Sequence, residues 1–263
     1  MKEIERLQKI IDESKNIVFF GGAGVSTESG MKDFRGKNGL YKIKTLNKSP
    51  EYLLSIACLY ENPKLFFEYY KKNMNCLNIE PNITHKYLKK LEDTGKLKAI
   101  VTQNIDGLHQ KAGSKKVIEL HGTIYNNYCT KCYKKYKENY IFETKGIPKC
   151  ECGGIVRPDV VLYGEMLPDS FEIASHYILK AETLIVAGTS LTVQPASGLI
   201  NQFTGKHLII LNNDKTPYDE VAEIVINKPL WEIISKLKIW KKIKNVKFLK
   251  KNQKNRYKIK KMC

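Results

Sequence analysis

Residues 16–30 read Asn-Ile-Val-Phe-Phe-Gly-Gly-Ala-Gly-Val-Ser-Thr-Glu-Ser-Gly and carry the clearest fold signal in the chain. The apolar run 16–20 predicts a strand, the glycines predict a tight turn, and we expect a helix to begin near Ser26. Glycines allow the backbone to approach a pyrophosphate, whose charge a helix N-terminus favours. Thr27 stands where the third glycine of the common dinucleotide-binding pattern belongs, so the motif alone also fits an ordinary glycine-rich turn.

Five further apolar runs of strand length lie downstream, and amphipathic helical patterns separate them. The runs span 98–101, 117–120, 183–187, 208–211 and 223–226. They are rich in Val, Ile and Leu without alternation, as expected for strands buried on both faces of a parallel sheet. The helical patterns span roughly 2–14, 82–94, 169–181, 194–204 and 229–239. This arrangement predicts an α/β fold in which helices cover a parallel sheet.

Two segments interrupt this pattern. Residues 41–81 are rich in Lys and aromatic residues and show helical periodicity, and residues 125–157 hold two close cysteine pairs. We expect them to form a smaller second domain that is inserted twice into the sheet domain. The expected organisation is a sheet domain of residues 1–40, 82–124 and 158–240, a small domain of residues 41–81 and 125–157, and a basic tail of residues 241–263.

Four of the seven cysteines follow the spacing Cys129-x2-Cys132-x17-Cys150-x-Cys152. Two such pairs separated by a loop can place four thiolates in a tetrahedron around Zn²⁺. Four protein ligands leave no open coordination position, so we expect the metal to be structural and not catalytic. The odd number of cysteines argues against a disulfide framework, and we expect the other three to be free thiols.

Polar side chains follow the predicted strands where each one ends, and in an open parallel sheet ligands bind at this edge. Residues 102–109 read Thr-Gln-Asn-Ile-Asp-Gly-Leu-His and supply amides and a carboxylate that suit a carboxamide or a ribose, although such residues also form ordinary turns. His121, followed by Gly122, ends another strand and is well placed for acid–base chemistry. Only His109 rivals it among the five histidines, and His85 fits a packing position.

The charge distribution bears on the partners and the location of the protein. The net charge is +18, no acidic residue follows Glu232, and residues 241–261 hold eleven Lys or Arg. Such a tail fits either a solvated, disordered end or an electrostatic arm for nucleic acid or nuclear import. No segment approaches the roughly 20 apolar residues of a membrane helix, and acidic residues near the N-terminus argue against a signal peptide. We therefore expect an intracellular protein without membrane contact.

Taken in order along residues 10–230, these motifs resemble the sirtuins, the silent-information-regulator family. The matching pieces are Gly-Ala-Gly-Val-Ser at 22–26, Asp-Phe-Arg at 33–35, Gln-Asn-Ile-Asp at 103–106, His-Gly at 121–122, the four cysteines, Gly-Thr-Ser at 188–190 and Asn-Asn-Asp at 212–214. The resemblance implies a Rossmann-like large domain, a small domain with structural zinc, and NAD as co-substrate in the cleft between them. The departures are Met31-Lys32 ahead of Asp-Phe-Arg, Tyr163 for the usual Phe, and a single residue within the second cysteine pair.

The resemblance also implies a role for each matched residue. His121 is the expected catalytic base, with Asn104 and Asp106 as further catalytic residues. A substrate peptide is expected to add as a β-strand along the segment 160–165 and beside Val193. The expected peptide contacts are Val160, Leu162, Tyr163, Gly164, Glu165 and Val193. The expected NAD contacts are Gly22, Ala23, Gly24, Ser26, Thr27, Asp33, Phe34, Arg35, Gln103, Asn104, Ile105, Asp106, Gly188, Thr189, Ser190, Asn212, Asn213 and Asp214.

The function implied by the resemblance is NAD-dependent removal of acyl groups from protein lysines, histone tails among them, which releases nicotinamide and O-acyl-ADP-ribose. Because of the basic tail, we expect a nuclear location more than a cytoplasmic one. Two alternatives remain open: a mono-ADP-ribosyltransferase that uses the same NAD site, and a zinc-stabilised chromatin-binding module that contacts DNA through the tail. The intact His121, Asn104 and Asp106 argue against the non-enzymatic alternative.

The acyl preference depends on residues 41–81. The Tyr-x-x-Arg typical of relatives that accept acidic acyl groups is absent from the corresponding residues 66–71, where Glu68 would repel a carboxylate. Apolar residues recur there at helical spacing, and we expect them to form the core of the small domain, with a tunnel for long acyl chains as the alternative. They are Ile56, Leu59, Leu65, Phe66 and Tyr69.

Overall fold

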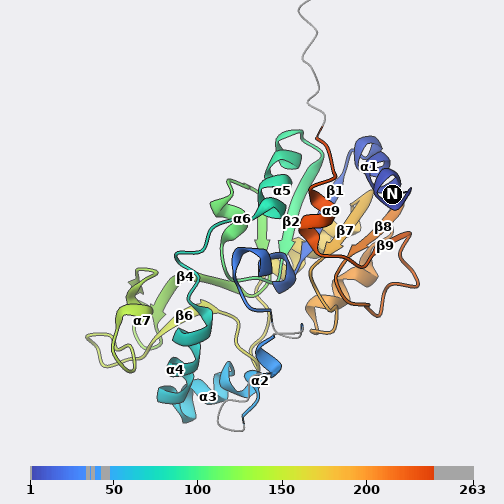
Figure 1. The fold of residues 1–263 in the computed structure, drawn as a ribbon. Coiled ribbons are helices and arrows are strands. Elements are labelled where there is room, and N and C mark those ends of the chain that lie inside the picture. The colour runs from blue at the N-terminus through green and yellow to red at the C-terminus, as the bar shows by residue number, and fades with distance from the viewer. Residues whose placement is uncertain (1, 34–35, 37–38, 43–47, 240–263) are drawn as a thin grey trace, which may run out of the picture.

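The computed structural model describes residues 2–33, 36, 39–42 and 48–239. Six parallel strands form the larger of two sheets, in the order β3-β2-β1-β7-β8-β9 (Figure 1). The strands are β1 at Ile17–Gly21, β2 at Leu97–Thr102, β3 at Val117–Glu119, β7 at Thr183–Ala187, β8 at His207–Leu211 and β9 at Ile224–Ile226. The predicted α/β fold is confirmed, and each apolar run overlaps one strand.

Helices cover both faces of this sheet, because alternate residues of each strand point to opposite cores. Phe19 belongs to one buried cluster with residues of α1, α5 and α9, whereas Val18 and Phe20 belong to another with residues of α8. These helices are α1 at Lys2–Glu13, α5 at Ile83–Asp93, α8 at Ser170–Leu179 and α9 at Leu230–Ile234. The helix predicted at 194–204 is instead a 3-10 helix, η4, at Ala196–Gln202, and the one predicted at 229–239 ends at Ile234.

A second, antiparallel sheet in the order β5-β4-β6 lies beside the large one, next to a group of helices (Figure 1). Its strands are β4 at Gly122–Cys129, β5 at Lys135–Tyr136 and β6 at Val156–Val160. The helices are α2 at Pro50–Leu53, α3 at Ile56–Glu61, α4 at Pro63–Met74 and α7 at Tyr140–Glu143. One hydrophobic cluster joins Phe66 and Tyr70 of α4 to Ile124 and Ile141, so the two interrupting segments pack against each other.

Short polar residues explain where these helices begin. Ser55 accepts a hydrogen bond from the Cys58 amide (3.0 Å), and Asn62 accepts one from the Leu65 amide (3.3 Å). Each bond satisfies an amide that has no partner within the helix. Pro63 then occupies the first turn of α4, where the missing N–H is not needed.

The segment after β1 differs from the prediction. It forms two single-turn 3-10 helices, η1 at Ala23–Val25 and η2 at Thr27–Ser29, and Gly30 ends the second with a φ of 96°. A Cβ on Gly24 would lie 2.8 Å from the Gly188 Cα, so the chain packs tightly against the loop after β7 and turns sharply there. The helix expected near Ser26 is therefore only a single 3-10 turn at Thr27–Ser29, with Ser26 as its N-cap residue.

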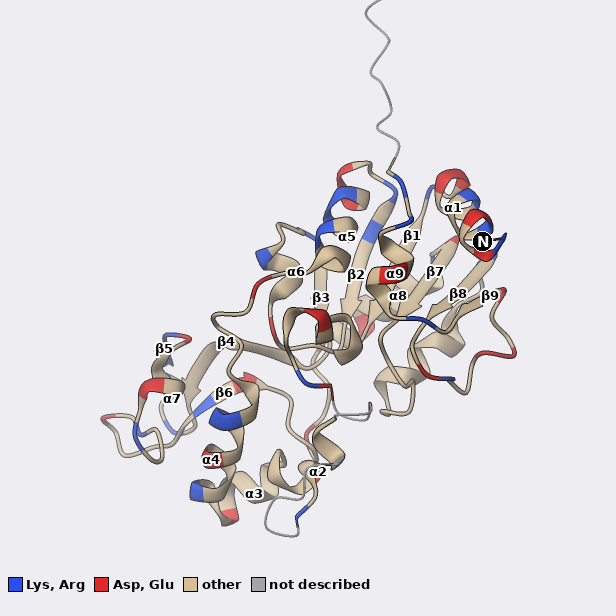
Figure 2. Ribbon diagram, in the orientation of Figure 1, with Lys and Arg blue, Asp and Glu red and all other residues tan. Residues whose placement is uncertain are grey.

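Charged residues are absent from the two central strands. β1 and β7 contain no Lys, Arg, Asp or Glu, and Figure 2 shows the charges mainly on helices and loops, with a Lys on β2. Within residues 2–33, 36, 39–42 and 48–239, no helix is both long enough and apolar enough to cross a membrane. The basic tail, residues 241–263, lies outside the described residues.

Candidate active site

The large sheet has its topological switch point between β1 and β7, since the chain continues from β1 to β2 on one side and from β7 to β8 on the other. The loops that follow these strands touch through glycine. The Gly24 amide donates to the Gly188 carbonyl oxygen (2.8 Å), and a Cβ on Gly22 would lie 2.7 Å from the Thr189 Cβ. Only backbone fits here, which forms the close cradle that a pyrophosphate requires.

A buried polar group of three side chains lies beside this cradle. The Ser26 hydroxyl donates to Asp106 Oδ2 (2.6 Å), and Asn104 Nδ2 donates to the Ser26 oxygen (3.0 Å). Asp106 Oδ1 accepts from the Leu108 amide (3.0 Å), which begins α6 at Leu108–Lys111. Burial raises the pKa of Asp106, although the hydrogen bonds from Ser26, Leu108 and Asn104 oppose that shift. The structure thus brings together side chains that are about 80 residues apart in the sequence.

Gln103 connects the loops after β1, β2 and β7. Its backbone N–H donates to the Gly21 carbonyl (2.9 Å), and its side-chain Oε1 accepts from the Thr189 hydroxyl (2.9 Å). Its buried Nε2 has no hydrogen-bond partner among the described residues. An unpaired buried donor is costly, and a ligand oxygen would satisfy it. Together with the glycine cradle, this donor fits a bound dinucleotide.

His121 stands between the two sheets, directly before β4. Its Nδ1 lies 2.9 Å from the Gln103 carbonyl oxygen, which can only accept, so Nδ1 carries the proton and Nε2 is free to act as a base. Burial lowers the pKa of His121, although the same hydrogen bond opposes the shift, so the ring is neutral at pH 7. Gly122 has a φ of 71°, and a Cβ there would meet the Asp159 carbonyl oxygen at 2.1 Å. Only glycine therefore allows the chain to turn into β4 at this point.

Other predicted NAD contacts lie further along the same edge. Asn212 follows β8 and is buried, and its side chain donates to the Asp214 carbonyl (2.8 Å). Asn213 and Asp214 are exposed. Ser190, next to Thr189, shares a hydrogen bond with Thr192 (2.8 Å).

The remaining predicted contacts are spread over the loops after β1 and β2. The Thr27 hydroxyl donates to the Gly24 carbonyl (3.0 Å), and the Ile105 carbonyl accepts from the Ile124 amide (3.1 Å). Asp33 accepts a hydrogen bond from the Gly36 amide (3.1 Å). Phe34 and Arg35 lie outside the described residues.

Segment 160–165 leaves the small sheet beside His121. β6 ends at Val160, so only the first residue of this segment belongs to a strand. The Val161 amide donates to the His121 carbonyl (2.9 Å), and both backbone groups of Tyr163 are paired with Leu54 and Ile56. No described residue accepts from the Gly164 amide. A peptide at this segment would therefore meet few free amides.

Arg157, which is buried, and Glu165, which is half-buried, form an ion pair that the sequence patterns did not indicate. Two Arg157 nitrogens donate to the two Glu165 oxygens (2.5 and 2.8 Å), and one also donates to the Val160 carbonyl (2.8 Å). Burial raises the pKa of Glu165, but these bonds and one from the Leu162 amide lower it overall. The pair fixes the end of β6 to the segment that follows.

The four predicted zinc ligands form one cluster at the tip of the small sheet. All four sulfurs lie within 4.8 Å of one another, and the Cys129–Cys152 and Cys132–Cys150 pairs are 3.5 and 3.6 Å apart. Tetrahedral Zn²⁺ with Zn–S bonds of about 2.3 Å places its sulfurs roughly 3.8 Å apart. The backbone amides of Lys131 and Cys132 also donate to the Cys129 sulfur (3.3 and 3.5 Å). The cluster fits a structural zinc.

His109, the rival candidate base, is enclosed in the core. It is 1% exposed, its ring contacts His85 and Phe19, and neither of its nitrogens has a partner among the described residues. His85 is also buried and uses its Nδ1 at the start of α5, while its Nε2 lacks a partner in the described part of the chain. His109 has no route to a ligand at the sheet edge.

Sequence comparison identifies relatives of nearly the same length. The Sir2 family model matches residues 22–195. A Clostridium perfringens protein named NAD-dependent protein deacetylase is 53% identical over 239 residues, which is 89% of this chain and 98% of that protein. A Staphylococcus epidermidis protein of the same name is 45% identical over 238 residues, which is 89% of this chain and 96% of that protein.

Solved structures agree with this assignment. A Sir2 variant with a deacetylated p53 peptide and 3'-O-acetyl ADP ribose has a TM-score of 0.82 at 38% identity, covering 89% of this chain and 96% of that one. A Sir2 complex with a p53 peptide and NAD⁺ has a TM-score of 0.80 at 38% identity, covering 88% and 95%. The glycine cradle, the buried polar group and the four cysteines thus occur in a chain that belongs to the Sir2 family.

Proposed function

We propose that the protein is an NAD-dependent protein-lysine deacetylase. The observation that carries the proposal is the orientation of His121, whose Nδ1 is held by the Gln103 carbonyl so that a basic Nε2 remains beside the polar edge of the sheet. The deacetylase names of relatives at 45–53% identity support it. So does the combination of this base with a cradle for a pyrophosphate.

We propose that NAD is held by the residues at the carboxyl edge of β1, β2, β7 and β8. Gly22, Ala23, Gly24 and Ser26 would hold the pyrophosphate, and Gln103, Asn104 and Asp106 the ribose and carboxamide. Bound NAD supplies the reactive bond between ribose and nicotinamide. Thr27, Asp33, Ile105, Gly188, Thr189, Ser190, Asn212, Asn213 and Asp214 complete the proposed set, together with Phe34 and Arg35 outside the described residues.

His121 acts in this proposal as a general base at Nε2. The neutral ring accepts a proton from a ribose hydroxyl, and the Gln103 carbonyl stabilises the imidazolium that forms, because the protonated ring still donates from Nδ1. Burial lowers the pKa of His121 and so favours the neutral ring before the reaction. Asp106 and Asn104 orient the hydroxyl through their network with Ser26.

The acyl-lysine is proposed to enter beside segment 160–165. The substrate backbone would pair with backbone carbonyls of segment 160–165 and with the Gly164 amide. Most other amides of this segment already donate within the chain. Val160, Leu162, Tyr163, Glu165 and Val193 are the proposed side-chain contacts. A related Sir2 structure at 38% identity holds a propionylated peptide, so a short acyl chain is the primary candidate.

The finer predictions about long acyl chains, histones and the nucleus have less support. Leu59, Phe66 and Tyr69 are buried in the small core, which favours packing over a tunnel for a long chain. The relatives reported above are bacterial, which gives no support to histone substrates or a nuclear location. DNA contact would depend on residues 241–263, outside the described residues. The division into a sheet domain and a small domain at the predicted boundaries is also a proposal.

Mass spectrometry of products tests the proposal. The parent, His121→Ala and, as a control, the exposed-histidine variant His176→Ala are incubated with acetyl- and myristoyl-lysine peptides, with and without NAD. We expect NAD-dependent free lysine and O-acyl-ADP-ribose from the parent and the control, and neither from His121→Ala. Transfer of ADP-ribose to protein without deacylation would replace this function with that of an ADP-ribosyltransferase.

A further inference from the structure

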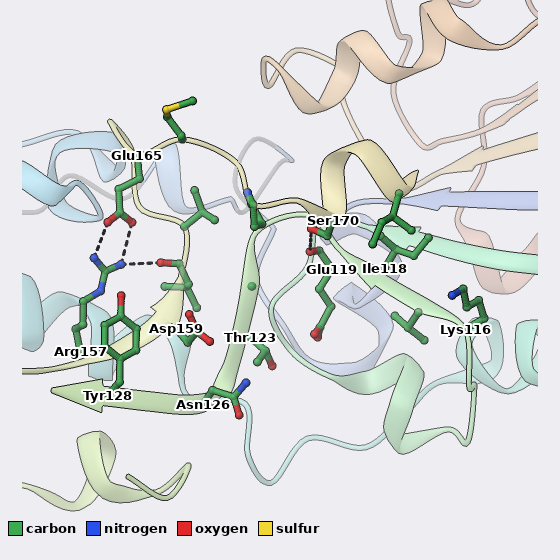
Figure 3. A pocket seen from close by; sticks show the side chains of 17 residues that line it. Lys116, Ile118, Glu119, Thr123, Asn126, Tyr128, Arg157, Asp159, Glu165 and Ser170 are labelled. Carbon is green, nitrogen blue, oxygen red and sulfur yellow. Dashed lines mark hydrogen bonds and ion pairs between the residues drawn. The ribbon is translucent and has the colours of Figure 1, made fainter. Parts of the chain in front are cut away.

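A cavity of about 540 Å³ lies where the two sheets meet, apart from the glycine cradle. We call it the junction cavity. Strands β3, β4 and β6 and the segment that leads into α8 form its walls (Figure 3). Its polar lining includes Glu119, Thr123, Asn126, Asp159 and Ser170, and no residue of the loops after β1 or β7 takes part.

The cations that line the junction cavity are already engaged. Arg157 is neutralised by its bidentate pair with Glu165, as Figure 3 shows. The Lys116 ammonium lies over the Tyr177 ring, 5.3 Å from its centre. Of the other charged residues that line the cavity, Glu119 and Asp159 are carboxylates, and the Lys116 ammonium keeps its charge because a ring contact does not neutralise it.

Two carboxylates in the cavity have no ion-pair partner. Asp159 is exposed, and neither it nor Glu119 forms an ion pair with a described residue. Burial raises the pKa of Glu119, hydrogen bonds from Gln110 and Thr123 lower it, and the charges of Asp106 and, to a lesser extent, Asp159 raise it further. Glu119 and Asp159 both line the cavity, and a cation bound there would offset these two like charges.

The cavity also offers backbone to an extended chain. β3 is an edge strand of the large sheet, and its residues 117–119 line the cavity. The pairing of β4 with β6 is interrupted between Thr123 and Asn127, which leaves Asn126 exposed. An open strand edge is a template for an extended polypeptide.

Apolar side chains at the rim add to this surface. Met166 is 92% exposed and Ile173 is 48% exposed, and both line the cavity. A carboxylate pair, a free strand edge and an apolar rim together match an extended, basic polypeptide better than a small anion.

We propose that the junction cavity binds a lysine or arginine side chain of the substrate protein, close in sequence to the acyl-lysine, with Asp159 as its main contact and Glu119 as a second. The inference rests on the proposed function. The cavity is continuous with the proposed substrate segment, because Val160, Val161 and Glu165 line both. A peptide bound along segment 160–165 therefore passes the junction cavity. A positive side chain on that peptide would complement the carboxylates of Asp159 and Glu119.

The proposal is tested by comparing peptides that differ only in the position of one charged residue. The peptides share one acetyl-lysine in neutral flanks, and a single Lys, or a single Glu, is moved through the three positions on each side. The enzymes are the parent, Asp159→Asn, Asp159→Lys, and Glu220→Gln, which removes an exposed acid outside the cavity. Both kcat/KM and peptide affinity by fluorescence anisotropy are measured at low and high salt.

For the parent and Glu220→Gln we expect one or more positions where Lys raises kcat/KM about two- to fivefold through KM, an effect that salt weakens. Asp159→Asn should lose this preference, and Asp159→Lys should reverse it in favour of Glu. Turnover of the neutral peptide with NAD should be similar in all four. If the parent shows no preference, or Asp159→Lys keeps it, the inference is wrong while the deacetylase function stands. If no peptide is deacetylated with NAD, the proposed function itself fails.

Discussion

The cradle at the edge of the large sheet and the four-cysteine cluster both hold polar atoms in a fixed arrangement, but by different means. The cradle joins loops around residues 24, 103 and 188, which meet only because three neighbouring strands place them together. The cysteine sulfurs come from the 24 consecutive residues 129–152, a segment whose own strand and helix, β5 and α7, are short. One site depends on the packing of a sheet, and the other on a metal that replaces missing packing.

The largest effect is expected from breaking the metal site. Cys129→Ser should remove zinc and unfold the small sheet, because structural zinc sites contribute about 10 kcal/mol or more in small modules. The large sheet should keep its secondary structure, since its two cores do not include the cysteines. Metal analysis and circular dichroism check this, with Cys58→Ala, which alters a buried thiol outside the cluster, as the control. Full zinc content in Cys129→Ser would contradict the assignment.

A smaller effect is expected from a single methyl group in the cradle. Gly188 has a φ of 58°, and its Cβ would lie 2.4 Å from the Val25 nitrogen, so Gly188→Ala must push the two loops apart. We expect NAD to bind about tenfold or more weakly, since such strain costs roughly 1–3 kcal/mol. Gly95→Ala is the matched control, because it has a φ of 77° with no atom within 4 Å. Equal NAD affinity in both variants, measured by calorimetry, would remove the cradle from the binding site.

Asp106→Asn should also weaken the use of NAD, but less than Gly188→Ala does. The carboxylate accepts from Ser26 and from the Leu108 amide, and an amide side chain turns one of these contacts into a clash of donors. We expect the KM for NAD to rise several-fold, by about 1 kcal/mol, with little change in zinc content. Asp93→Asn, on the surface of α5, should leave KM unchanged. Steady-state kinetics with varied NAD would settle it, and an unchanged KM in Asp106→Asn would count against the ribose assignment.

The smallest effect concerns pH. Because burial lowers the pKa of His121, the neutral base persists to lower pH than an exposed imidazole, whose pKa is about 6.5. Activity should fall as pH decreases through the folded-state pKa, so the acid limb of kcat/KM should have its midpoint below 6.5. Zinc content followed over the same range separates this limb from metal loss. A midpoint above 6.5 would contradict the burial argument.

The sequence predicted the strands and the cluster of four cysteines well, for physical reasons that differ. Buried parallel strands require continuous apolar runs such as 183–187, and metal ligation requires thiols at short spacing, so both leave local patterns. The 3-10 turns after β1 could not be predicted, because they result from contact with Gly188, over 160 residues away. The Arg157–Glu165 pair leaves no local pattern either, and it depends on how segment 160–165 folds back.

The most direct test of the central claim separates binding from chemistry in His121→Ala. NAD and peptide affinities are measured by calorimetry, and a single turnover of acetyl-lysine peptide is followed with saturating NAD. The account predicts affinities within a few-fold of the parent and a rate of deacetylation that is lower by about 10²–10⁴, the usual contribution of a general base. Deacetylation at the parent rate, or loss of NAD binding equal to the loss of rate, would show that His121 is not the base.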